Sequence, residues 1–221
     1  MDYISNKIET LITKIISLYE KHLDIDKSQI SIVKYSLRLV ISTIIGYLLA
    51  LVCAYFLGTF SYVLTIMITI SIYRSFSGGA HCSSMINCAV YGMIIINLLG
   101  LLVSKTILPN QGIILVLCFL AFSFAIWTIN KYAPADTPGK PIESKVKKVK
   151  LRKRSFLIIC IWYGSTIAWH FIFKEMHQII YISAIGIIWQ SFTLTPIGYK
   201  FCHIWDMALN KIFFIKGDMY A

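Results

Sequence analysis

Long apolar runs without charge constrain this chain more than any other feature of its sequence. The first run covers Leu39–Tyr73, thirty-five residues without Asp, Glu, Lys or Arg. A helix needs roughly 20 apolar residues to cross the hydrocarbon core of a bilayer. Because this run is too long for one span and Leu57-Gly58-Thr59 interrupts it, we predict two membrane helices joined by a tight turn.

Four further apolar runs predict an all-α integral membrane protein with about six transmembrane helices. They cover Met85–Val103, Ile113–Ile129, Phe156–Phe173 and Ile179–Ile197. Apolar types form 57% of the 221 residues and charged types only 14%, against roughly a quarter charged in typical soluble domains. This composition excludes a soluble enzyme and a disordered tail. It also excludes a nucleic-acid-binding domain, which needs its positive charge on a folded surface that faces water.

The distribution of basic residues predicts the orientation of the chain. The sequence contains 21 Lys and Arg residues against 10 Asp and Glu residues, a net charge of +11. With six spans and both termini in the cytoplasm, nineteen of the basic residues lie on the cytoplasmic side, and only Lys105 and Lys174 lie outside. Because Lys and Arg are enriched in cytoplasmic loops, we predict a multi-pass protein of the cell membrane with both termini and the loop 74–88 in the cytoplasm.

We expect one membrane domain over 1–221, with a first helix that differs from the others. Apolar residues such as Ile8, Leu11 and Ile15 recur at steps of three and four, opposite charged residues. This pattern is typical of an amphipathic helix that lies on the inner leaflet; the alternative is that the apolar stripe packs on another protein helix. The expected parts are the interfacial helix 1–30, spans within 39–73, the polar loop 74–88, spans within 85–129, a basic cytoplasmic loop 130–155, spans within 156–197 and a cytoplasmic tail 198–221.

The loop 74–88 contains the residues that are best suited to chemistry. A thiol attacks a peptide carbonyl only as the thiolate, so a nucleophilic cysteine such as Cys88 needs a base or a cation nearby. His81 can take that proton and deliver it to a leaving amine. Gly78 and Gly79 permit a sharp bend, and Arg74 supplies positive charge. These residue types indicate a cysteine nucleophile with an imidazole partner.

The spacing of His81 and Cys88 restricts the backbone conformation that would let them interact. On one continuous helix, His81 and Cys88 would share a face but lie about 10 Å apart, which is too far for proton transfer. The partnership therefore requires a chain that is not regularly helical between them. Cys82 remains a rival nucleophile, and the structural alternative is a hydrated histidine beside a cysteine that only packs. The chain has no GxSG motif, no HExxH motif and no pair of membrane aspartates, so cysteine chemistry is the protease mechanism that remains.

The sequence predicts neither a metal nor a cofactor. Its six cysteines have no paired spacing and no CxxC motif, which argues against a disulfide framework and a structural zinc site. Cys202, His203 and Asp206 are a weak set of metal ligands. We interpret their segment as an amphipathic stretch at the membrane edge.

The spacing of Arg74, Gly78, Gly79, His81 and Cys88 resembles the AgrB family of quorum-sensing peptidases. A second block, Tyr132–Ile142 followed by a basic run, is also similar to that family. The resemblance implies a thiol protease that removes the C-terminal tail of an AgrD-like propeptide through an acyl-enzyme and promotes closure of a thiolactone or lactone ring. It further implies that Cys88 is the nucleophile, rather than Cys82, and that His81 is the general base and acid.

The same resemblance assigns supporting roles. Asp136 either orients His81 or caps the turn at Thr137-Pro138-Gly139. Lys145, Lys147 and Lys148 lie in the basic run, which enforces topology and touches anionic lipid of the inner leaflet, and which also attracts the charged tail of the propeptide. The family further implies a substrate that enters from the inner leaflet, and a homodimer.

Two alternatives involve no covalent chemistry, namely a small membrane peptide transporter and a membrane scaffold. Transporters mark their pathway with charges inside the membrane or with discontinuous helices in repeated halves. The sequence has no internal repeat and no Asp, Glu, Lys or Arg inside a predicted span, which argues against transport.

Overall fold

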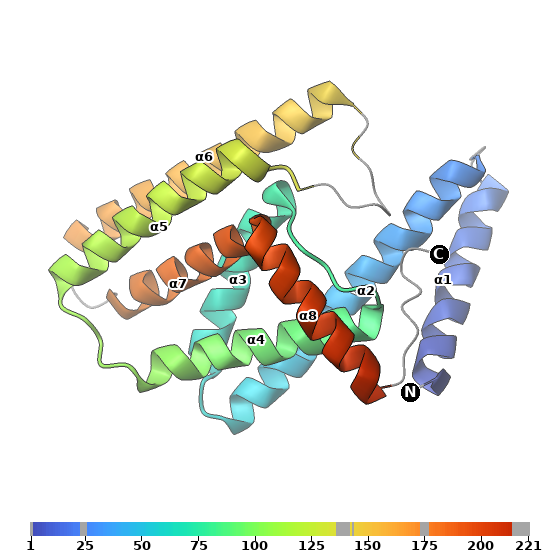
Figure 1. Cartoon of the computed structure of the whole chain (residues 1–221), viewed down its shortest axis with the longest axis horizontal. Coiled ribbons are helices and arrows are strands. Elements are labelled where there is room, and N and C mark those ends of the chain that lie inside the picture. The colour runs from blue at the N-terminus through green and yellow to red at the C-terminus, as the bar shows by residue number, and fades with distance from the viewer. Residues whose placement is uncertain (1, 23–25, 136–141, 143, 173–176, 214–221) are drawn as a thin grey trace.

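The computed structural model describes residues 2–22, 26–135, 142, 144–172 and 177–213, and this part of the chain is helical (Figure 1). The helices, in chain order, are α1 (Asp2–His22), α2 (Lys27–Phe56), α3 (Phe60–Ser77), α4 (Met85–Lys105), α5 (Gln111–Tyr132), α6 (Lys145–Ile172), α7 (His177–Leu194) and α8 (Pro196–Phe213).

Five of these helices, α2 to α6, are long and apolar enough to cross a membrane. Helices α7 and α8 meet that criterion only together, and the chain bends by 87° at the break between them. The count of five or six candidate spans confirms the prediction of an all-α, multi-pass membrane protein.

The bend between α7 and α8 follows from local chemistry at Thr195 and Pro196. The Thr195 hydroxyl accepts a hydrogen bond from the Gly198 N–H at 3.1 Å, and Pro196 is the first residue of α8. A proline at this position removes an N–H that has no partner within the helix. The segment 198–221, which the sequence predicts to be a tail, is helical as far as Phe213. It belongs to α8, which packs on α4 and α7.

The core is built around α7, which packs on α5 and α3 and lies below α5 and α6 in Figure 1. Most of its residues are buried, and one cluster of buried side chains joins Ile187 of α7 to Tyr73 of α3 and Ile129 of α5. Gly186 permits a close approach, because a Cβ atom there would lie 3.3 Å from Thr69.

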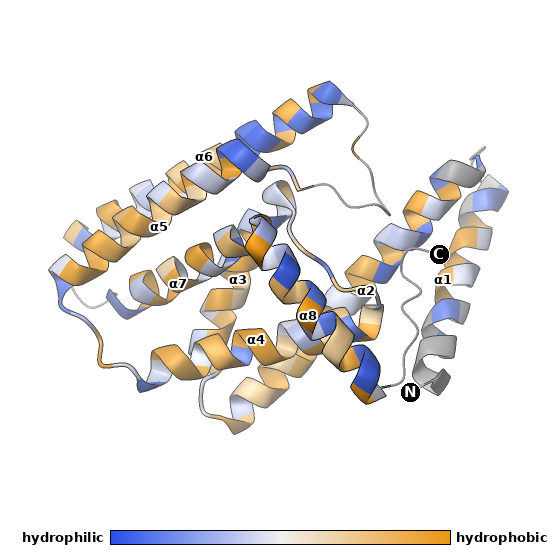
Figure 2. Ribbon diagram, viewed as in Figure 1, coloured by the Kyte–Doolittle hydropathy of each residue, from blue (hydrophilic) through white to orange (hydrophobic). Residues whose placement is uncertain are grey.

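The end of α3, the end of α5 and the first part of α6 meet at one end of the bundle. The Ala135 N–H, just after α5, donates to the Ser77 carbonyl at 2.8 Å. The Arg152 side chain of α6 donates to the Ala133 carbonyl at 2.8 Å. Figure 2 shows the hydrophilic start of α6 at this end. The two sequence blocks that resemble the AgrB family are therefore neighbours in space as far as Ala135.

Helix α1 packs against the first half of α2. Its Ile12 and Ile16 are buried, as is Tyr35 of α2, whereas Leu11 and Leu18 are more than half exposed. Packing on a protein helix therefore accounts for part of the apolar stripe, and the rest remains available to a membrane surface.

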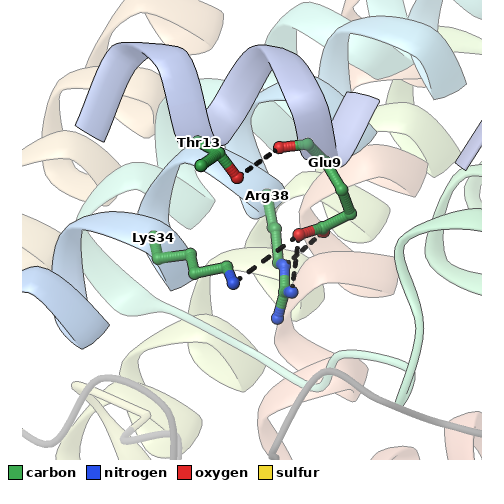
Figure 3. Close-up of polar contacts among 4 residues, drawn as sticks. All are labelled: Glu9, Thr13, Lys34 and Arg38. Carbon is green, nitrogen blue, oxygen red and sulfur yellow. Dashed lines mark hydrogen bonds and ion pairs between the residues drawn. The ribbon is translucent and has the colours of Figure 1, made fainter. Parts of the chain in front are cut away.

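A charged contact joins the same two helices (Figure 3). The Glu9 carboxylate accepts hydrogen bonds from Arg38 Nε at 2.7 Å and Nη2 at 2.9 Å, and Lys34 Nζ lies 3.7 Å away. The hydrogen bond from Arg38 is the main cause of a lowered pKa at Glu9. A bidentate pair of this kind also fixes the register between helices.

We predict that Glu9→Gln loosens α1 without unfolding the bundle. Losing a partly exposed charge pair costs roughly 1 kcal/mol, so amide hydrogen exchange across α1 is expected to accelerate about 5-fold. Glu20→Gln, which changes an exposed carboxylate of the same helix, is the control and is expected to change exchange less.

Acid is expected to have the same effect on α1 in the unmodified chain. Because the docked state lowers the pKa of Glu9 from its ordinary value of 4.5, the pair stabilises docking fully above that value. Its contribution is lost as the pH falls through the lowered pKa. An exchange rate in α1 that is the same at pH 3 and pH 7, after correction for intrinsic exchange, would contradict this assignment.

Candidate active site

A break in the helical backbone places His81 over the start of α4. Helix α3 ends at Ser77, and the next two residues, Gly78 and Gly79, have φ values of +69° and +152°. Residues with a Cβ atom rarely adopt these conformations. Helix α4 restarts where the Ser84 hydroxyl accepts a hydrogen bond from the Asn87 N–H at 3.1 Å, an N-cap interaction. The chain between His81 and Cys88 is therefore bent.

The bend brings the imidazole and the thiol together. His81 Nδ1 lies 3.7 Å from Cys88 Sγ, and Arg74 Nη2 lies 3.2 Å from the other ring nitrogen, Nε2. A guanidinium has only donors, so a hydrogen bond here requires Nε2 to accept. The ring proton is then on Nδ1 and points toward Cys88. This arrangement suits a thiolate at Cys88, with Arg74 as the nearby positive charge.

Side chains of α7 hold the loop and Arg74 in place. Gln190 Nε2 donates to the Gly78 carbonyl at 2.7 Å, and Gln190 Oε1 accepts from Arg74 Nη1 at 3.4 Å. The Ala80 N–H donates to the Thr193 carbonyl at 3.2 Å, and the Ala80 carbonyl accepts from Arg74 Nη2. Sequence analysis missed Gln190 and Thr193, although a glutamine inside an apolar span is itself a signal of function.

A second polar cluster fixes the start of α4 from α8. The buried Asp206 carboxylate accepts from Asn87 Nδ2 at 2.7 Å and from the Ser83 N–H at 3.1 Å. Asn87 Nδ2 also donates to Asn210 Oδ1 at 2.7 Å. Because Asn87 directly precedes Cys88, this cluster determines where the thiol is presented. Sequence analysis considered Asp206 only as a weak metal ligand and missed its partner Asn87.

The rival thiol, Cys82, lies in a different environment. It is 1% exposed, and its Sγ atom lies 3.7 Å from the Sγ atom of the buried Cys202. The hydrogen bond with Cys202, followed by that with Cys88 and by burial, raises the pKa of the Cys82 thiol. Cys82 therefore stays protonated at neutral pH and is a poor nucleophile.

A cavity of about 110 Å³ opens beside the pair. Helices α2, α3, α4 and α7 line it, and His81, Cys88 and Arg74 are among its lining residues. The cavity provides space within the bundle next to the thiol.

Among the described residues, the other predicted site residues do not line this cavity. Lys145, Lys147 and Lys148 are exposed at the start of α6, and Asp136 lies outside the described residues. Over the described ranges, no three His, Cys, Asp or Glu side chains lie close enough to hold a metal ion.

Comparison with known proteins matches nearly the whole chain to members of one family. The family model of AgrB, accessory gene regulator B, matches residues 11–194. A putative AgrB-like protein of Clostridium perfringens is 30% identical over 216 residues, which cover 93% of this chain and 99% of the relative. An accessory gene regulator protein B of Staphylococcus aureus is 30% identical over 200 residues, which cover 90% of this chain and 98% of the relative. No solved structure matches the chain.

We predict that Gly78→Ala destabilises the protein more than Gly58→Ala does. Both glycines have similar φ values, +69° and +67°, and Gly78 also has a ψ of −155°, a combination that is essentially restricted to glycine. A Cβ at Gly78 would lie 2.6 Å from the Ala135 carbonyl oxygen, whereas a Cβ at Gly58 would meet nothing within 4 Å.

Thermal unfolding in detergent tests this difference. Gly78→Ala is expected to lose about 1–3 kcal/mol more than Gly58→Ala, because overpacking displaces the backbone and because the conformation of Gly78 strains a residue with a Cβ atom. Equal midpoints for the two variants would show that Ala135 does not pack against the loop as described.

Proposed function

The chain belongs to the AgrB family, a family of peptidases that process AgrD propeptides, and we propose that it is a membrane cysteine endopeptidase acting on an AgrD-like propeptide. It removes the C-terminal tail of that propeptide and promotes cyclisation of the remainder. The observation that supports this most directly is the 3.7 Å distance between His81 Nδ1 and Cys88 Sγ, beside a cavity in the bundle.

In the first step, the Cys88 thiolate attacks a carbonyl carbon of the propeptide. A C–S bond forms, the peptide C–N bond breaks, and the leaving amine takes a proton from the His81 imidazolium. The products of this step are a thioester on Cys88 and a free C-terminal tail. The N–H groups of Met85 and Ile86 stabilise the oxyanion that forms between attack and collapse, because the next two N–H groups of α4 are already bonded to Ser84.

Proton transfer from Cys88 to His81 requires a change at Arg74. To accept the thiol proton on Nδ1, the neutral ring must carry its hydrogen on Nε2, and Nε2 then cannot accept from Arg74. The contact of 3.2 Å therefore belongs to the resting state. Arg74 keeps the Ala80 carbonyl and Gln190 Oε1 as acceptors when it leaves the ring.

In the second step, an internal thiol or hydroxyl of the propeptide attacks the thioester. A new C–S or C–O bond closes a thiolactone or lactone, and Cys88 is released as the thiol. Water competes with this step, so the site must exclude it. The position of Cys88 between packed helices, at the edge of the membrane spans, supports that requirement.

The basic start of α6 supports a cytoplasmic site and a charged leaving tail. Lys145, Lys147 and Lys148 are exposed there, at the end of the bundle that also holds the loop. We propose that both termini and the loop face the cytoplasm, and that these lysines contact anionic lipid and attract the tail. We also propose a homodimer, as the family resemblance implies.

The nucleophile assignment predicts three different outcomes for single substitutions. Purified protein in lipid vesicles, mixed with an AgrD-type propeptide, is expected to release the tail, as measured by mass spectrometry. Cys88→Ala and His81→Ala are expected to lower the rate at least 10³-fold, since each removes a group that forms or breaks bonds. Cys82→Ala is expected to retain the rate within about 3-fold.

Two results would contradict the proposal. Tail release that persists in Cys88→Ala would exclude Cys88 as the nucleophile, and a propeptide left whole by the unmodified protein would exclude the peptidase function. Thermal unfolding of each variant separates loss of catalysis from loss of structure.

The same assignment predicts selective alkylation, without any substrate. Iodoacetamide is expected to modify Cys88 at least about 10-fold faster than Cys82 at pH 7, because the raised pKa of Cys82 keeps it a thiol. Peptide mapping measures both rates. Faster labelling of Cys82 would reverse the roles of the two cysteines.

A further inference from the structure

We propose that the cavity beside Cys88 binds the apolar side chain of the propeptide residue whose carbonyl carbon Cys88 attacks, and that Gly92 sets the largest side chain it accepts. This inference rests on the proposed peptidase function and adds a specificity site to it. Among the described motif residues, only Arg74, His81 and Cys88 line this cavity, and they lie at its mouth.

The cavity follows one face of α4 away from Cys88. Gly92, Ile95 and Ile96 line it at steps of four, seven and eight residues from the thiol, the spacing of one helix face. At a rise of 1.5 Å per residue, Ile96 lies about 12 Å along the helix from Cys88. Tyr47 of α2 and Trp189 of α7 line the same cavity. A side chain that enters at Cys88 therefore points toward the membrane interior.

The deeper walls of the cavity favour an apolar occupant. Ile95 and Ile96 are buried, and the Tyr47 hydroxyl is paired with Ser71 Oγ at 2.6 Å. The uncharged polar side chains of the lining already have partners. Gln190 donates to the Gly78 carbonyl of the loop, and the hydroxyls of Thr193, Ser42 and Thr43 donate to backbone carbonyls of Gln190, Met85 and Leu39. A basic side chain would be repelled by the Arg74 guanidinium at the mouth, and beside Ile95 and Ile96 it would lose its hydration without gaining a partner.

Charge also decides which side of the cut bond enters the cavity. The basic start of α6 lies beside the end of α3, where the Arg154 guanidinium lies 5.9 Å from the centre of the Phe76 ring. The cavity extends along α4 toward the interior of the bundle instead. A charged tail is attracted to the basic surface and excluded from the apolar cavity, so the residue before the cut is the one that enters.

Gly92 is the position at which the volume of the cavity can be changed without disturbing the fold. A Cβ atom there would meet nothing within 4 Å. Gly46 lines the same cavity, but a Cβ there would lie 3.1 Å from the Cα atom of Ala89, so it is required for α2 to approach α4. Larger side chains at position 92 therefore fill free space, and they also favour the helix.

The test uses synthetic AgrD-type propeptides and the purified protein in lipid vesicles. After mass spectrometry has located the cut, the residue before it is varied to Leu, Phe, Ala and Lys. The unmodified protein is expected to cleave the Leu and Phe versions with a kcat/KM at least about 10-fold above that for Ala, because each methylene buried in an apolar pocket contributes about 10-fold or more. The Lys version is expected to be the poorest substrate, because Arg74 at the mouth repels its charge and the deeper walls give its ammonium group no partner.

Gly92→Leu is expected to lower kcat/KM for the Leu and Phe versions at least about 10-fold, because the larger side chain fills the cavity. Its kcat/KM for the Ala version is expected to fall less than about 3-fold. Gly92→Ala is expected to lower kcat/KM for the Leu and Phe versions by less than Gly92→Leu does. Gly164→Leu is the matched control, because Gly164 also lies in a membrane helix, α6, and a Cβ there would meet nothing within 4 Å. It is expected to behave as the unmodified protein does, and thermal unfolding verifies the fold of each variant.

The outcomes separate the two proposals. If the unmodified protein cleaves no propeptide, the peptidase function itself fails. If it cleaves Leu and Ala versions equally, or if Gly92→Leu retains the full rate on the Leu and Phe versions, the peptidase function stands and the cavity is not the specificity site. A rate that falls equally for all versions in Gly92→Leu also overturns the inference.

Discussion

The site depends on the hydrogen bonds that the Gln190 side chain of α7 forms with Arg74 and with the loop after α3. Gly78 and Gly79 permit the backbone to turn, but they do not by themselves select one direction for the turn. The Gln190 amide does so by donating to the Gly78 carbonyl while its oxygen accepts from Arg74. The Thr193 carbonyl then receives the Ala80 N–H. Because unpaired backbone groups are costly in an apolar setting, these bonds leave the loop few alternatives, and His81 is placed over Cys88.

The surroundings of the loop divide into two regions with different affinities for a substrate. The start of α6 presents exposed basic residues near the end of α3, whereas the cavity along α4 has polar groups at its mouth and apolar side chains such as Ile95 and Ile96 beyond it. A peptide with an apolar segment before the cut and a charged tail after it can satisfy both regions at once. The thiol lies between them. The contrast between a basic surface on one side of the thiol and an apolar cavity on the other gives the proposed peptidase a physical means of choosing the bond it cuts.

The three cysteines near the loop show how position controls reactivity. Cys82 and Cys202 face one another in a buried cluster, where a thiolate would be poorly solvated. Cys88 faces an imidazole, with a guanidinium behind it. Chemically identical side chains, six residues apart in the chain, are therefore separated into an inert thiol and a candidate nucleophile. The buried Asp206, through Asn87, holds α4 at the position that makes this separation possible.

The sequence alone determined the membrane helices and the candidate loop, because apolar runs, interrupting glycines and basic flanks act locally on the backbone. It also indicated that His81 and Cys88 could meet only if the helix broke. Tertiary structure decided how the break is held, which thiol is buried, and that the chain turns by 87° into α8. The contacts responsible, such as Gln190 to Gly78 and Asp206 to Asn87, join residues 112 and 119 positions apart. No local periodicity encodes such pairs, since they form only after the helices have packed.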